Sequence, residues 1–248
     1  MEVAILTVGD EVLAGDTENT NATWLAGRLT DAGATVTRIL TVPDDRAVIA
    51  EAVREWHEAF DAVLVTGGLG GTHDDVTVDA IADAFGRDLV VDPAVREDVI
   101  ETVAAYRDRT PETVAAHDID IDLDVDAWAA LPAGSRPLLN PEGLCPGCVI
   151  DDVYVFPGVP AEMRALFAAV AEEFGGDVVS TTLYTPQPEG SMVDALAAVR
   201  DQFGVTVGSY PSTGEHNRLK VTGTDADAVA AAAAWLRDRI EVVETPEP

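Results

Sequence analysis

The chain has 248 residues, of which 47% are hydrophobic, and its 45 Asp and Glu against 15 Lys and Arg give a formal net charge of −30. This hydrophobic fraction excludes a disordered polymer, and no apolar run approaches the roughly 18 to 20 residues that span a bilayer. The N-terminal residues have neither a basic region nor a small-residue cleavage site, so we expect a soluble, cytoplasmic protein. The acidic surface predicts no nucleic-acid and no membrane partner.

The acidic residues are spread along the whole chain, and only one of the basic residues, Lys220, is a lysine. Repulsion among so many carboxylates destabilises a compact fold unless salt screens it. We therefore interpret the charge as halophilic adaptation to a salt-rich cytoplasm. An acidic interaction tail is the alternative, but it fits a dispersed distribution poorly.

The first half of the chain alternates strand-like and helix-like segments. Residues 3–8 form an apolar run of strand length, and residues 20–29 carry apolar side chains at helical spacing. A second strand is predicted over 35–42, a helix over 46–60 with Asp44 as its N-cap, and a third strand over 62–66. Such alternation is typical of an α/β protein with a mostly parallel sheet.

The remaining segments suggest a second, smaller domain. After the glycine-rich loop 67–75 we expect a helix near 78–85, another over 93–106, an acidic surface excursion over 109–125, a short strand pair within 137–156 and a helix ending near 174. Residues 178–240 then have a β-α-β-β-α pattern, followed by a frayed tail at 245–248. The predicted boundaries are 1–174 and 175–248.

The loop after the third strand carries four glycines within five positions. Glycines allow positive φ and close approach of the backbone to a ligand, and the following helix offers unpaired N–H groups. A phosphate or pyrophosphate is the natural ligand, although the loop matches neither a Walker motif nor the dinucleotide fingerprint. An ordinary glycine-rich turn with Asp75 as a helix N-cap is the alternative.

Acidic side chains follow all three predicted strands: Asp10 and Glu11 the first, Asp44 the second, and Asp74 and Asp75 the third. The carboxyl ends of parallel strands share one edge of a sheet, so these carboxylates should converge on one cleft. Bare carboxylates repel a phosphate, so a divalent cation between them is expected. Each could instead be a helix cap or a solvated loop residue, and His73 could be a base or merely a polar loop residue.

The two cysteines, Cys145 and Cys148, are spaced as in a thioredoxin-type redox pair. They stand in a loop followed by a strand-like segment over 149–156, whereas a redox pair opens a helix. Two thiols also cannot complete a four-ligand zinc site. We expect no redox function from them.

Several motifs occur in a fixed order along the chain: Gly9 to Gly15, Thr20-Asn21, Gly67 to Gly70 with Thr72 to Thr77, Asn140-Pro141 with Gly143, Pro146-Gly147, and Pro157 to Pro160 with Glu162-Met163. On these motifs the chain resembles the N-terminal domain of the competence/damage-inducible CinA proteins, within the MoaB/Mog molybdopterin-binding fold. The segment with Gly208-Ser209-Tyr210-Pro211 resembles the small domain that follows in that family.

The resemblance implies a three-layer α/β/α MoaB/Mog-like domain with a small C-terminal α+β domain, and a ligand that is a nucleotide or pterin phosphate. The function it favours is metal-dependent hydrolysis of a nucleoside diphosphate-linked compound, such as ADP-ribose or FAD. The alternatives are a non-catalytic molybdopterin or nucleotide binder and a molybdopterin adenylyltransferase. A homo-oligomer, a dimer or trimer, is also implied. The deamidase domain of longer CinA proteins has no counterpart in this sequence, so deamidation is not expected.

The matched positions imply site residues. Asp75 and Asp44 are the expected catalytic residues and metal ligands, with support from Asp10 and Glu11. The metal is of the Mg²⁺ type, with K⁺ as a further candidate cation. The expected ligand- and phosphate-binding residues are Gly67, Gly68, Leu69, Gly70, Gly71, Thr72, Asp74, Thr77, Asn21, Asn140, Gly143, Gly147, Pro157 and Gly158.

Three departures from the family pattern matter. Gly71 replaces a usual proline, which should loosen the loop, and Cys145 replaces a usual alanine. A lysine common in the family is absent, because Asp126 or Ala127 occupies that stretch. Charge neutralisation would then depend more on the metal and on backbone N–H groups, with Arg46 or Arg218 as candidate helpers.

Overall fold

The computed structural model describes residues 1–109, 124–211 and 216–243. Most of the predicted acidic excursion and the whole predicted tail therefore lie outside the described residues. By internal contacts the chain divides into two compact units, residues 1–29 with 35–174, and residues 30–34 with 175–248. Each unit is described by itself.

The first unit contains the strands β1 (Glu2–Val8), β2 (Thr35–Val42), β3 (Ala62–Thr66), β4 (Leu89–Val91), β5 (Ala130–Pro132), β6 (Arg136–Leu138), β7 (Gly147–Ile150) and β8 (Val153–Phe156). Its helices are α1 (Asp10–Leu13), α2 (Thr20–Asp31), α3 (Arg46–Ala59), α4 (Thr77–Phe85), α5 (Pro93–Arg109), α7 (Val125–Trp128) and α8 (Pro160–Val170), the last followed by a 3₁₀ turn (Ala171–Glu173).

Six strands form one sheet in the order β2-β1-β3-β8-β7-β6. The pairs β1/β2, β1/β3 and β3/β8 are parallel, whereas β7/β8 and β6/β7 are antiparallel. The sheet is mostly parallel, which confirms the predicted fold class. Because β1, β2 and β3 are adjacent and parallel, the segments that follow them emerge at one edge.

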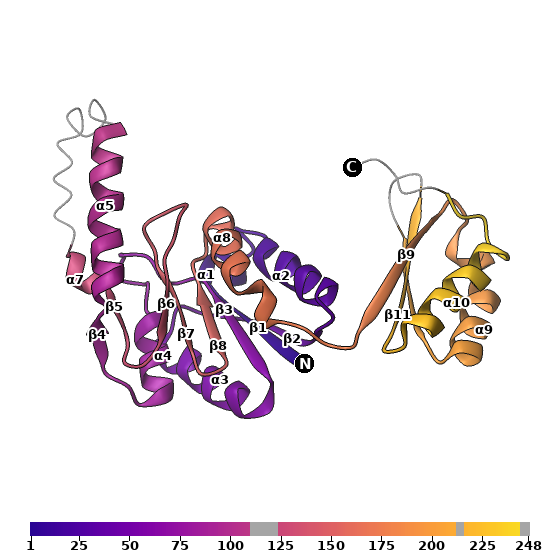
Figure 1. Cartoon of the computed structure of the whole chain (residues 1–248), viewed down its shortest axis with the longest axis horizontal. Helices are drawn as coiled ribbons and strands as arrows, with labels where there is room; N and C mark the ends of the chain where they lie inside the picture. Colours follow the sequence, from indigo (N-terminus) through magenta and orange to yellow (C-terminus); the bar gives the residue numbers. More distant parts are fainter. Residues whose placement is uncertain (110–123, 212–215, 244–248) are drawn as a thin grey trace. The chain divides into compact units, whose positions relative to one another are not determined.

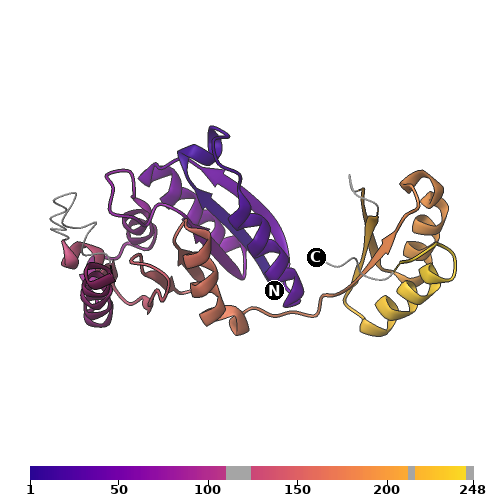
Figure 2. The same cartoon turned by 90° about the horizontal axis from the view of Figure 1, so that it is seen from above.

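Helices cover both faces of this sheet, with α3 and α4 on one side and α2 and α8 on the other (Figures 1 and 2). Ala4, Leu6 and Val8 of β1 pack in the core beside α3 and α4. On the opposite face, Phe167 of α8 makes edge contacts with Trp24 of α2 and Phe156 of β8. Successive side chains of the buried strands β1 and β3 point to opposite faces of the sheet, and both faces are covered by helices. This arrangement gives three layers.

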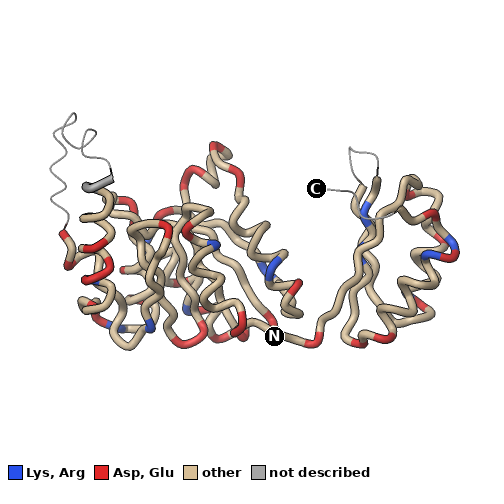
Figure 3. The backbone as a smooth tube through the Cα atoms, turned by 45° about the horizontal axis from the view of Figure 1, so that its top comes forward, with Lys and Arg blue, Asp and Glu red and all other residues tan. Residues whose placement is uncertain are grey.

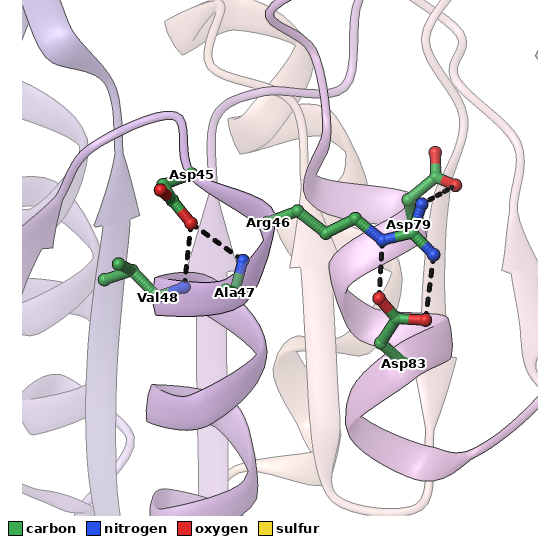
Figure 4. Close-up of polar contacts among 6 residues, drawn as sticks. All are labelled: Asp45, Arg46, Ala47, Val48, Asp79 and Asp83. Carbon is green, nitrogen blue, oxygen red and sulfur yellow. Dashed lines mark hydrogen bonds and ion pairs between the residues drawn. The ribbon is translucent and has the colours of Figure 1, made fainter.

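The structure corrects two local predictions. Asp44 is not the N-cap of α3, because the Asp45 carboxylate accepts the hydrogen bonds from Ala47 N and Val48 N at 2.8 and 3.1 Å (Figure 4). The single strand predicted over 149–156 is a hairpin, in which β7 and β8 turn at Asp151 with φ of 50°. Together with β6, this region holds three strands where a pair was expected.

The second unit contains β9 (Val179–Thr185), a 3₁₀ turn (Glu189–Ser191), α9 (Val193–Phe203), β10 (Thr206–Tyr210), β11 (Asn217–Gly223) and α10 (Ala226–Arg237). The β-α-β-β-α order is as predicted. Its three strands form an antiparallel sheet in the order β10-β11-β9, and Leu183, Leu219 and Val221 pack with both helices in its core.

Acidic residues are distributed over both units with few basic residues among them (Figure 3). In the portion of the chain that the structure describes, no helix combines the length and the apolar character needed to cross a membrane.

Candidate functional site

A cavity of about 230 Å³ lies at the edge of the six-stranded sheet where β1, β2 and β3 end. The segments after these strands line it, and residues from the start of α2 and from the loop before α8 complete the wall. The lining residues are Thr7, Val8, Gly9, Glu11, Val12, Thr17, Glu18, Asn19, Thr20, Asn21, Asp44, Thr66, Gly67, Gly68, Asp74, Asp75, Gly158 and Pro160. We call it the carboxylate cavity.

The glycine-rich loop is anchored to the sheet and to α4. Gly67 N donates to Phe156 O at 3.1 Å, and the buried Thr77 hydroxyl donates to Gly67 O at 2.9 Å. Gly67 and Gly68 have φ of 108° and 65°, which disfavour any other residue there. A Cβ on Gly67 would also collide with the carbonyl oxygen of Val8. Thr77 therefore holds the loop in place.

The same loop leaves several donors unused. Thr72 N and Asp75 N make hydrogen bonds within the loop. The N–H groups of residues 68–71 donate to no acceptor among the described residues. Successive backbone N–H groups in a glycine-rich turn form a concave anion site. The loop thus has the donors that a phosphate requires.

Asp75 closes the loop on itself. Its Oδ2 accepts from Thr72 N at 2.9 Å and from Thr72 Oγ1 at 2.5 Å. A Cβ on Gly70 would lie 3.0 Å from Asp75 Cγ and nearer still to Oδ2, so the approach requires glycine at position 70. Asp75 also lines the carboxylate cavity, whose wall it shares with Asp44.

Asp44 is held at the mouth of the cavity by the first strand's exit loop. Its Oδ2 accepts from Asp10 N at 2.8 Å. Burial raises the pKa of Asp44, and the nearby charges of Asp10, Glu11 and Asp74 raise it further, while the hydrogen bond from Asp10 N opposes them. The predicted convergence of carboxylates occurs for Glu11, Asp44, Asp74 and Asp75, whereas Asp10 contributes its backbone N–H and does not line the cavity.

Asn21 is a buried polar residue with one side-chain atom that has no hydrogen-bond partner among the described residues. Its Nδ2 donates to Gly158 O at 2.7 Å and to Thr66 Oγ1 at 3.2 Å, which fixes the orientation of the amide. Its Oδ1 is buried and accepts no hydrogen bond from the described residues. Since Asn21 lines the carboxylate cavity, this oxygen is suited to accept a ligand hydroxyl or amine.

Other predicted binding residues lie elsewhere. The buried Asn140 donates to Glu162 Oε2 at 2.7 Å and to Cys145 O at 2.8 Å, so it braces the loop before β7. Burial raises the pKa of Glu162, and the hydrogen bond from Asn140 opposes that shift. Asn140 and Gly143 line a separate cavity beside α5, Gly147 is buried in β7, and the Pro157 carbonyl accepts from Thr66 Oγ1 at 2.9 Å.

The two candidate helpers, Arg46 and Arg218, and the candidate base His73 do not line the carboxylate cavity. Arg46 makes two hydrogen bonds to Asp83, at 2.5 and 2.8 Å, and one to Asp79 at 2.9 Å (Figure 4). The Arg218 guanidinium lies 4.9 Å from the ring centre of Tyr210 in the second unit, and the His73 side chain is 98% exposed. Among the lining residues of the cavity none is Lys, Arg or His.

The residues of the cavity fit a divalent cation of the Mg²⁺ type that the ligand helps to coordinate. No group of three or more His, Cys, Asp or Glu side chains within the described residues is placed to hold a metal ion. Mg²⁺, however, is commonly bound by one or two carboxylates, with waters and substrate phosphates completing the shell. Asp44 and Asp75 could supply those carboxylates, so a cation that arrives with a phosphate ligand fits better than a closed protein site.

A second cavity, of about 450 Å³, lies along the same loop and includes Leu69, Gly70, Gly71 and Thr72 in its wall. Sequence reasoning missed its aromatic residue, Trp128. A lone tryptophan in a short helix-like segment usually packs in a core. The signal that could have drawn attention to it is the glycine at position 71, which leaves room beside the loop.

The two cysteines are not joined in a disulfide. Both are free thiols, and Cys148 is buried within β7. Burial raises the pKa of each to about 12. A reactive cysteine has a lowered pKa, so the raised pKa of each thiol argues against a redox role, and the absence of that role stays a prediction.

The fold and the glycine-rich loop define a class of protein. Residues 4–175 match the family model described as "Probable molybdopterin binding domain", and residues 177–245 match "FAD synthase, middle domain". The chain therefore belongs to the molybdopterin-binding domain family.

Within that family the chain is CinA-like and has the fold of the CinA N-terminal region. The protein CinA from Thermoplasma acidophilum matches 70% of this chain and 97% of its own, with a TM-score of 0.57 and 35% identity. A CinA-like protein of Salinibacter ruber is 37% identical over 97% of this chain and 58% of its own length. A protein of Archaeoglobus fulgidus is 39% identical over 96% and 97% of the two chains.

Proposed function

We propose that the chain hydrolyses the pyrophosphate bond of a nucleoside diphosphate-linked compound, of the ADP-ribose or FAD type, in the presence of a divalent cation. The observation that carries the proposal is the carboxylate cavity itself. Gly68, the first loop residue with an unused N–H group, lines it together with five acidic side chains, Glu11, Glu18, Asp44, Asp74 and Asp75, and its lining has no basic side chain. The other unused N–H groups belong to Leu69, Gly70 and Gly71, which line the adjoining second cavity.

This combination favours a ligand that brings a cation with it. A phosphate against bare carboxylates is repelled, and the repulsion is strong where water is partly excluded. A bound Mg²⁺ would neutralise phosphate charge and lower the pKa of a coordinated water. The protein's own part is to orient the phosphates with the N–H groups of residues 68–71 and to present Asp44 and Asp75 beside them.

Asn21 supports a ligand with hydroxyl groups. Its buried Oδ1 needs a donor, and the sugar hydroxyls of a nucleotide supply one. An inorganic phosphate alone, which has no sugar hydroxyl, would leave Asn21 Oδ1 without a hydrogen-bond donor. The proposed substrate therefore carries a sugar close to its phosphates.

A second candidate is favoured by the family match, whose description names molybdopterin binding. In this case the same cavity would bind a pterin phosphate, either without chemistry or during adenylyl transfer from ATP. The same loop and cation argument applies to either ligand.

The test incubates the whole chain with ADP-ribose, with FAD, or with ATP plus molybdopterin, each with Mg²⁺ or with EDTA. Hydrolysis of ADP-ribose yields AMP and ribose 5-phosphate, because water adds across the P–O–P bond. Adenylyl transfer yields pyrophosphate only when molybdopterin is present, and a pure binder yields no product. Release of neither AMP nor FMN from the first two compounds with Mg²⁺ would refute the hydrolase proposal.

Asp75→Asn supplies the residue-level prediction. We expect turnover to fall on the order of 10²-fold or more, the size typical of removing one electrostatic group from a reaction centre. Asp83→Asn is the matched control, because Asp83 carries the same charge on α4 but pairs with Arg46 outside the cavity. If Asp75→Asn turns over ADP-ribose as fast as Asp83→Asn does, then Asp75 is not part of the site.

A further inference from the structure

The second cavity lies directly beside the proposed phosphate loop. It shares Gly68 and Asp75 with the carboxylate cavity, so the loop forms a wall of both. The two differ in lining, since eight of the fifteen residues around the second cavity have apolar side chains, against three of the eighteen around the first. The apolar lining of the second cavity is Leu69, Val78, Leu89, Ala127, Trp128, Ala130, Leu131 and Pro146.

Trp128 is held on a short but well-anchored helix. The Asp124 carboxylate caps α7 by accepting from Ala127 N at 3.1 Å, and Arg96 of α5 pairs with Asp126 at 2.7 Å. Directly after Trp128, strand β5 pairs with β4. Because α7 is capped by Asp124 and runs directly into β5, the Trp128 side chain should lose little conformational entropy when a ligand binds against it.

Gly71 allows the indole to lie against the loop. A Cβ on Gly71 would be 2.5 Å from Cζ2 of Trp128 and 3.0 Å from Cε2, closer than real contacts allow. Any side chain at position 71 would push the indole away. The glycine at position 71 therefore makes room for an aromatic wall, and its loosening effect on the loop stays a prediction.

We propose that the second cavity binds the planar heterocyclic ring of the same ligand, with Trp128 as its stacking partner. This inference rests on the proposed function, because the ring is the one attached to the phosphates at the loop. A cavity with an indole and other apolar side chains in its wall, beside an anion site, suits a molecule that is aromatic at one end and phosphorylated at the other. The volume of about 450 Å³ is within the range of small-molecule sites.

The polar groups of this cavity favour a ring that carries an amino group. Asp79 and Asp124 also line it, and carboxylates accept hydrogen bonds from exocyclic amines. Asp79 pairs with Arg46 and Asp124 caps α7, so neither would be left uncompensated without the ligand. An adenine ring meets this description, and its binding is distinguished from that of a flavin in the test below.

The test measures dissociation constants by calorimetry for the whole chain with Mg²⁺, using ADP-ribose, FMN and inorganic pyrophosphate. Loss of a stacking partner typically costs about 1 to 3 kcal/mol, which is roughly 5- to 150-fold in affinity. We expect Trp128→Ala to weaken ADP-ribose by that factor and to leave pyrophosphate within about twofold. Trp128→Phe should keep most of the affinity that the parent chain has for ADP-ribose.

Four results would contradict the inference in whole or in part. If Trp128→Ala weakens ADP-ribose and pyrophosphate equally, the indole only supports the loop; if it weakens neither, the ring binds elsewhere. Weakening of FMN but not of ADP-ribose would assign the cavity to a flavin and refute the amine argument. A parent chain that binds neither ADP-ribose nor pyrophosphate would overturn the proposed function, and the inference with it.

Discussion

Replacing Asp44 by Asn should stabilise the protein at neutral pH while impairing its site. The Asp44 carboxylate is partly buried and lies near three other carboxylates, which together raise its pKa. A carboxyl group whose pKa is raised by folding favours the native state only when protonated, so its charge opposes folding as pH rises through the folded-state pKa. Asn removes that charge and can still accept the hydrogen bond from Asp10 N.

The size of the effect follows from opposing contributions. Each like-charge contact at a partly exposed site is worth about 0.2 to 1 kcal/mol. Converting a charged hydrogen bond into a neutral one loses about 1 kcal/mol. With three neighbouring carboxylates and the desolvation of Asp44, we expect a net gain of about 0.5 to 1 kcal/mol, or roughly 1 to 4 °C in Tm for a chain of this length.

The assay is thermal unfolding followed by circular dichroism between pH 4 and 7.5, with Asp45→Asn as the matched control. Asp45 caps α3 and is stabilised by the helix dipole, so its neutralisation should lower Tm by a similar amount. The gain from Asp44→Asn should grow as pH rises and shrink toward pH 4, where the native carboxyl becomes protonated. A lower Tm for Asp44→Asn at pH 7, or a gain that does not change with pH, would refute the reasoning.

Two further predictions concern the whole chain. With a pKa of about 12, each thiol is roughly one part in 10⁴ ionised at pH 8. Iodoacetamide should therefore leave both cysteines unmodified in the native protein and alkylate both in denaturant. Rapid labelling of the native protein, detected by mass spectrometry, would revive a redox role. Tm should rise between 0.1 and 3 M KCl, because salt screens the repulsion within a chain of net charge −30. The Debye length falls from about 10 Å at 0.1 M to about 3 Å at 1 M. A constant or falling Tm would contradict the salt-adaptation hypothesis.

The parts of the fold that local pattern determines were predictable. Strands β2 and β3 have the predicted bounds. The apolar run of β3 specifies a strand buried on both faces, whereas β2, a mostly exposed edge strand, is marked by its β-branched residues between Gly33 and Pro43. The convergence of carboxylates followed from topology, since three adjacent parallel strands deliver their exit loops to one edge. Neither result required knowledge of side-chain contacts.

The parts that depend on distant contacts were not predictable. Asp44 and Asp45 both satisfy the pattern of a helix N-cap, and only the tertiary hydrogen bond from Asp10 N decides that Asp44 faces the cavity. Strands β4 and β5 are three residues each and about 40 positions apart, too short for their pattern to stand out. Asn140 was expected to touch a ligand, yet its donors are used by Glu162 and Cys145.

The glycine-rich loop shows why a motif alone underdetermines a site. Gly67 is required by the carbonyl of Val8, Gly70 by the carboxylate of Asp75, and Gly71 by the indole of Trp128. Gly68 is required by its φ of 65° and by the hydroxyl of Thr77, so all four glycines are explained within the protein, without any ligand. What argues for a phosphate is therefore the set of N–H groups at residues 68–71 that these contacts leave unused. A substitution at Trp128 therefore probes ring recognition without altering these N–H groups, whereas one at Asp75 probes turnover.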